Sequence, residues 1–187
     1  RRTRDCPCMG RLEAVQRFLS AVQAWRAAQA KGSTTLQCIK TGIGDFLQQD
    51  SHDESAVLAL TGREDLASLV VQKENDGTST LRLESEFRRL VRCTAKLRAS
   101  LEEMYRALRQ LEDSTSLEIE ATQAVALLVD MFEVEFQLKE SIVNDTTLDT
   151  PEAVLTTYER SWGSQPYIEQ PFTADTLKML EELAAKA

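Results

Sequence analysis

The sequence predicts an all-α protein, built as a long antiparallel helical hairpin or coiled coil with shorter flanking helices and a flexible acidic linker. Good helix formers dominate the 187 residues, whereas only 7 are Gly and 4 are Pro. Apolar residues recur at the three-to-four-residue spacing of amphipathic helices. One stretch also keeps a strict heptad spacing, which is typical of a coiled coil.

The N-terminal part is predicted to hold amphipathic helices over residues 10–47. The first helix covers roughly residues 10–31, because its large apolar residues share one face. These residues are Leu12, Val15, Phe18, Leu19, Val22 and Trp25. Gly32 and Ser33 are predicted to break or kink this helix. The period then resumes, weakened by two further glycines that each cost about 1 kcal/mol relative to Ala.

Residues 48–80 are predicted to form a flexible acidic linker. This polar stretch cannot bury enough apolar surface to order itself. A modest apolar run from Leu66 to Val71 predicts a short docking helix inside it. The only histidine, His52, also lies here, and we expect it to be solvated, because a general base needs a structured pocket and a partner.

The strongest pattern is an unbroken run of four heptads, which we call the heptad seam. Its positions alternate at four and three residues, and Thr94 is the only polar member. They are Leu83, Phe87, Leu90, Thr94, Leu97, Leu101, Met104, Leu108 and Leu111. A repeat of this length predicts a coiled coil. Two alternatives stay open: helices of the same chain fill the seam, or a partner helix does, and both hold if the helix uses more than one face.

A turn at residues 112–116 and a second long helix complete a predicted helical hairpin over residues 81–143. The second helix has a broad apolar face, which Leu127, Met131 and Leu138 widen further. A short turn between two long helices makes them antiparallel neighbours.

Residues 150–187 are predicted to form a capping and docking segment. It opens with Thr150 as the cap of a helix that has Pro151 at its first position, where the missing N–H is harmless. That helix is predicted to end at Trp162 and Gly163.

Beyond this helix, residues 165–172 are predicted to be extended, because a residue that precedes Pro is disfavoured in the α region. A last short helix follows, with Thr173 or Asp175 as its cap. Two roles stay open for Trp162 and Tyr167. Either they close the end of the hairpin within the chain, or they bind a partner, as aromatic residues often do at interfaces.

The same segment carries a pattern that resembles a known family. The run Leu155-x-x-Tyr158-x-x-x-Trp162-x-x-Gln165-Pro166-Tyr167-Ile168-Glu169, followed by a short Leu-rich helix, is similar to the C-terminal signature of the cyclin-dependent kinase 2-interacting protein family. The specific match covers roughly residues 151–183. The order of segments is also similar over residues 10–45 and 81–143, whereas the linker and the Arg-rich N-terminus differ from the family pattern.

The resemblance implies a non-catalytic helical adaptor of the nucleus and cytoplasm. Family members are linked to cyclin-dependent kinase 2 and the replication-initiating kinase, and to the cell cycle, DNA replication and DNA-damage checkpoints. They are also implied to pair with another small helical protein as a subunit of an AAA+ ATPase assembly, with roles in ribosome biogenesis and replisome turnover. The chain is then expected to be part of a hetero-oligomer. The candidate partner-binding residues are Leu83, Phe87, Leu90, Leu97, Leu101, Met104, Leu108, Trp162, Gln165, Pro166 and Tyr167.

Direct binding to nucleic acid or to a membrane is not expected. The net charge of −8 opposes binding to phosphates, which usually needs a basic stripe. The arginines near the N-terminus are interpreted as solvated, with residues 1–9 forming a disordered basic end. No apolar stretch approaches the ~20 residues that span a bilayer.

No catalytic site, cofactor site or metal site is predicted. The sequence contains no Gly-rich phosphate loop and no nucleophile elbow, and Cys6-Pro7-Cys8 with one distant histidine is not a zinc spacing. We expect reduced thiols. Two alternatives to the adaptor remain: a secreted cytokine-like four-helix bundle, which would need a signal peptide and paired cysteines, and a generic coiled-coil scaffold subunit.

Overall fold

A computed structural model describes residues 7–59, 66–113 and 119–185, with side chains at residues 10–45, 80–113 and 119–185. Every regular element in these ranges is a helix, so the predicted all-α fold class is confirmed. The helices are α1 (Pro7–Ala59), α2 (Leu66–Glu112), α3 (Ile119–Asp145), α4 (Glu152–Ser164) and α5 (Gln170–Ala185).

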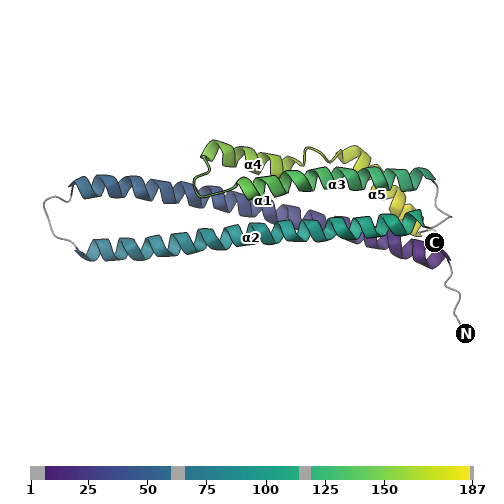
Figure 1. Cartoon of the computed structure of the whole chain (residues 1–187), viewed down its shortest axis with the longest axis horizontal. Coiled ribbons are helices and arrows are strands. Elements are labelled where there is room, and N and C mark those ends of the chain that lie inside the picture. Colours follow the sequence, from purple (N-terminus) through teal and green to yellow (C-terminus); the bar gives the residue numbers. More distant parts are fainter. Residues whose placement is uncertain (1–6, 60–65, 114–118, 186–187) are drawn as a thin grey trace, which may run out of the picture.

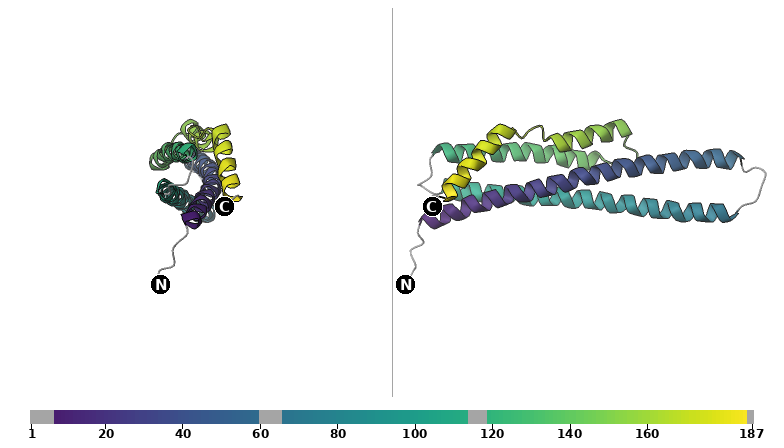
Figure 2. Two further views of the ribbon diagram at one scale, coloured as in Figure 1. Left: turned by 90° about the vertical axis from the view of Figure 1, so that its right-hand side faces the viewer. Right: turned by 180° about the vertical axis from the view of Figure 1, so that it is seen from behind.

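The two longest helices, α1 and α2, are antiparallel and lie side by side (Figure 1). Helix α3 runs along one half of this pair, α4 reverses direction and packs on α1, and α5 crosses obliquely toward the beginning of α1 (Figure 2). The predicted neighbours α2 and α3 are therefore in contact. Helix α1 packs along α2 as well, which the heptad pattern alone does not indicate.

Helix α1 continues without interruption through Gly32 and Ser33, so the predicted break is wrong. Gly32 is the point where Trp162 packs on α1: a Cβ at this position would lie 2.2 Å from Cζ2 of the indole. The lower helix propensity of Gly is thus offset by close packing against a large side chain. Gly42 has a similar role, because a Cβ there would lie 2.7 Å from Cδ2 of Leu83.

The connection between α1 and α2 falls within the predicted acidic linker. Its backbone is helical at residues 48–59 and 66–80, and residues 60–65 lie outside the described residues. The short helix predicted near Leu66 forms the first turns of α2. At the other terminus, residues 7–9 of the predicted disordered end begin α1 instead, whereas residues 1–6 lie outside the described part of the chain.

The turn between α3 and α4 differs from its prediction by one residue. Pro151 is the N-cap of α4 and has no side-chain capping bond, and its carbonyl accepts from the N–H groups of Val154 and Leu155. Thr150 stabilises the turn rather than the helix. Its hydroxyl accepts from the N–H of Thr147 at 2.8 Å and donates to the carbonyl of Asp145 at 3.2 Å.

The segment after α4 is a tight turn, not the predicted extended stretch. Gln165 adopts a left-handed conformation with φ 49° and ψ 64°, even though it precedes Pro166. The N–H of Ile168 closes the turn on the carbonyl of Gln165 at 3.0 Å. Helix α5 then begins at Gln170, earlier than predicted, because Pro171 in its first turn needs no hydrogen-bond acceptor. Neither Thr173 nor Asp175 is therefore its cap.

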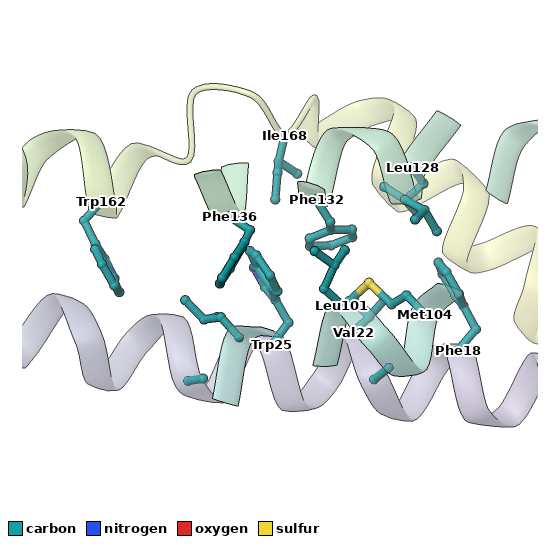
Figure 3. Packing of buried hydrophobic residues seen from close by; sticks show 14 of the residues in the cluster. Phe18, Val22, Trp25, Leu101, Met104, Leu128, Phe132, Phe136, Trp162 and Ile168 are labelled. Atoms are coloured by element: carbon teal, nitrogen blue, oxygen red, sulfur yellow. The ribbon is translucent and has the colours of Figure 1, made fainter. Parts of the chain in front are cut away.

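The core is one apolar cluster that lies between α1, α2 and α3 and is covered by α4 and α5. Trp25 of α1 meets Phe132 of α3 edge to face, with ring centroids 5.0 Å apart and planes at 69° (Figure 3). Met104 of α2 lies beside them (Figure 3). The core is thus built from residues of all three long helices.

Candidate partner-binding site

The heptad seam is buried inside the chain. Leu90, Leu97 and Met104 are between 0% and 1% exposed, and Phe87 is half-buried against the core. The other members are also buried, namely Leu83, Thr94, Leu101, Leu108 and Leu111. Helices α1 and α3 fill the seam from two sides. Of the two predicted alternatives, the structure therefore has the seam filled by helices of the same chain. Binding of a partner by these residues stays a prediction, and it requires the helices to separate.

Trp162 is fully buried and links α4 to α1. Its indole Nε1 donates to the carbonyl of Gln29 at 3.0 Å, and the amide Nε2 of Gln29 donates to the carbonyl of Trp162. This reciprocal pair fixes the indole over Gly32. Trp162 therefore makes its contacts within the chain, which is the intramolecular one of its two predicted roles.

A buried ion pair of α3 lies beside the same indole. Glu135 and Lys139, one helical turn apart, have side chains that are 0% exposed. The Lys139 ammonium also donates to the carbonyl of Trp162 at 3.3 Å and lies 5.1 Å from the ring centroid. Burial lowers the pKa of Lys139, and the hydrogen bond and negative charge of Glu135 oppose this shift.

The turn that follows Trp162, which we call the tail turn (residues 165–169), is held by this ion pair. The second carboxylate oxygen of Glu135 accepts the backbone N–H of Tyr167 at 3.1 Å. Ile168 is buried in the core. Pro166 is exposed, Gln165 is half-buried, and the Tyr167 side chain is 51% exposed. The tail residues thus separate into an inner anchor, Trp162, and an outer pair, Pro166 and Tyr167.

Three residues that hold Trp162 and the tail turn in place were not among the predicted site residues, namely Gln29, Glu135 and Lys139. A Glu and a Lys four residues apart usually form a solvated surface pair. Helical spacing nevertheless places both on the arc of α3 that holds Phe132 and Phe136. That position, in an otherwise apolar arc, is the signal that indicates a buried pair.

Neither a metal-binding cluster nor a membrane-spanning helix occurs in the described part of the chain. It contains no cluster of three or more His, Cys, Asp or Glu side chains arranged to hold a metal ion. None of the described helices combines the length and apolarity that a membrane-spanning helix needs. Cys38 and Cys93 are free thiols, and burial raises the pKa of Cys93. His52 lies outside the residues whose side chains are described.

The fold and the tail turn define an all-helical bundle with an internally filled heptad seam and a braced, partly exposed aromatic turn. No family model, no curated protein and no solved structure matches the chain.

Proposed function

We propose that the chain is a non-catalytic helical adaptor of the kind found in the cyclin-dependent kinase 2-interacting protein family. It pairs with another small helical protein as a subunit of an AAA+ ATPase assembly, located in the nucleus and cytoplasm. Its roles are in maturation of the large ribosomal subunit and in DNA replication and genome maintenance, with links to cell-cycle kinases. The sequence pattern from Leu155 to Glu169 supports this proposal.

The observation that carries the proposal is the construction of the tail turn. The residues of the quoted pattern divide into a buried part, Trp162 and Ile168, and an exposed part, Pro166 and Tyr167. The buried ion pair holds the backbone of Tyr167 in place. A preformed turn loses little conformational entropy on binding, and a half-exposed Tyr supplies contact area, so the exposed part suits a protein partner.

Affinity purification of the tagged full chain from cells of its source organism tests the proposal. We expect a small helical protein and an AAA+ ATPase to co-purify in stoichiometric amounts. Tyr167→Ala is expected to reduce their recovery roughly tenfold, because central aromatic contacts often cost more than 1.4 kcal/mol when truncated. Val91→Ala is the matched control, since Val91 is 56% exposed on α2, where it lines a groove with Glu140 and Val143 of α3 and no residue of the tail turn.

The opposite result is a chain that remains monomeric, unfolds in one sharp transition and recovers neither protein. It would overturn the adaptor proposal and leave only the fold.

A further inference from the structure

Helix α3 has a second apolar face outside the core, which we call the outer stripe. It consists of Leu127, Met131, Val134 and Leu138, spaced by four, three and four residues. Leu127 and Val134 are 49% and 42% exposed, whereas Met131 and Leu138 are half-buried at the edge of the core. In the end-on view α3 lies at the periphery of the bundle, between α4 and α2 (Figure 2).

The spacing of the outer stripe is that of a helix-pairing seam. Exposed apolar residues that are scattered singly are normal on a protein surface. Here two exposed and two half-buried apolar residues repeat along one line of a helix whose core face is already occupied by other residues, among them Phe132 and Phe136. The line is about 16 Å long at 1.5 Å per residue, which is enough for three turns of a second helix.

The exposed charged residues of α3 itself are all acidic. The only basic residue of α3 is Lys139, which is buried against Glu135. Among the acidic residues, Glu140 pairs with Arg98 of α2. The remaining ones have no ion pair among the described residues, namely Glu120, Asp130, Glu133 and Asp145.

Two of these carboxylates extend the line of the stripe. Glu120 lies seven residues before Leu127, and Asp145 lies seven residues after Leu138. Asp130 flanks the stripe between Leu127 and Val134. The surface is therefore an apolar line with acidic groups at both ends and along one side.

We propose that the outer stripe binds an amphipathic helix of another protein, with apolar residues at alternating three- and four-residue spacing and Lys or Arg at the flanking positions. This inference rests on the proposed adaptor function, and it identifies the surface and the chemistry of a helical partner. A second copy of α3 does not fit, because two such stripes would bring acidic residues against acidic residues. Helix α2 of a second copy cannot bind the outer stripe through its basic residues either, since the heptad seam that these residues flank is buried.

Binding of synthetic helical peptides to the full chain tests the proposal. One probe has about three heptads with Leu at the seam and Lys at the flanks, and a second probe has the same seam with Glu at the flanks. We expect the Lys probe to bind roughly tenfold or more tightly than the Glu probe, as measured by calorimetry at low and high salt. Equal affinities would overturn the assignment of a basic partner.

Variants locate the binding surface. The double variant Leu127→Gln/Val134→Gln is expected to weaken binding of the Lys probe roughly tenfold or more, while Val91→Gln on α2 leaves it unchanged. All three positions are exposed, so the circular dichroism and melting temperature should stay those of the wild type. A loss of binding in Val91→Gln alone, or in neither variant, would overturn the proposal. The proposal would also be overturned if the wild type sedimented as a dimer and the double variant as a monomer, because the occupant of the stripe would then be a second copy.

The same double variant separates this inference from the proposed function. If the tagged variant recovers the small helical protein and the ATPase as well as the wild type does, the outer stripe is the wrong surface while the adaptor function stands. If the wild type recovers neither protein yet binds the Lys probe through the stripe, the adaptor function fails and the surface stands.

Discussion

At Gly32 the indole of Trp162 in α4 packs directly against the backbone of α1. The indole of Trp162 is rigid, and its Nε1 donates to the carbonyl of Gln29, whose amide in turn donates to the Trp162 backbone carbonyl. The indole therefore cannot yield to a Cβ 2.2 Å away as the end of a flexible side chain would. We expect Gly32→Ala to lower the free energy of unfolding by roughly 1–3 kcal/mol, despite the higher helix propensity of Ala. Urea denaturation followed by circular dichroism measures this change.

Gly44→Ala is the matched control for that substitution. It lies in the same helix, and no atom outside the local backbone lies within 4 Å of a Cβ built there. We expect a gain in stability of about 0.5–1 kcal/mol. If both variants were stabilised, the close packing of Trp162 on α1 would be contradicted.

Single residues show what a sequence pattern reveals and what it leaves out. Helical spacing predicted that the seam residues and Trp25 share buried faces, because periodicity reports direction around a helix. It did not distinguish a glycine that breaks a helix from one that admits a distant indole, so Gly32 was misinterpreted. The buried pair of Glu135 and Lys139 was missed for a similar reason, since its partners come from α4 and the tail turn.

Between helices, the Glu135–Lys139 pair joins α3 to α4 and to the tail turn. Lys139→Met would leave the Glu135 carboxylate buried without a counter-charge, and we expect a loss of about 3–5 kcal/mol in unfolding free energy. The double variant Glu135→Gln/Lys139→Met removes both charges and keeps an acceptor for the Tyr167 N–H. It should recover most of that loss, as measured by thermal and urea denaturation.

The Arg98–Glu140 pair supplies the comparison. It also joins two helices, α2 and α3, but its side chains are 58% and 38% exposed. Glu140→Gln should therefore cost less than about 1 kcal/mol. Equal losses for Glu140→Gln and Lys139→Met would show that burial of the Glu135–Lys139 pair has no energetic consequence.

The elements of the fold were predicted with uneven success. Helices α3 and α4, and α2 from residue 81 onward, were expected near their observed positions, because long apolar periods and the Thr150-Pro151 signal are local. The beginning of α2 at Leu66 lies inside the predicted linker. The tail turn was predicted to be extended from the general effect of Pro on the preceding residue. Its left-handed Gln165 depends on contacts of the turn with α3, and such contacts are not local in sequence.

On the scale of the whole molecule, α2 is shared between two neighbours. The period of the heptad seam indicates a buried face but not which helix covers it, because any apolar helix of matching length satisfies the same spacing. With α1 and α3 both packed on α2, the outer stripe of α3 is an apolar line that no described helix covers completely. The one sequence observation that pointed there was the wide apolar face to which Leu127, Met131 and Leu138 belong.

The length of α1 and α2 leads to a prediction about local stability. The end of α1 and the beginning of α2 project beyond α3 and α4 as a two-helix arm (Figure 1). Two helices alone bury less apolar surface than a bundle of three or more, so local opening of the arm should require less free energy. We expect backbone amides of residues 50–59 and 66–75 to exchange with deuterium at least about tenfold faster than those of residues 20–40 and 90–110, a difference of about 1.4 kcal/mol.

Each slow segment belongs to the same helix as a fast one, so each helix provides its own control. Equal protection that persists on dilution would show that the arm is as stable as the bundle, whereas protection lost on dilution would show that a second molecule covers it.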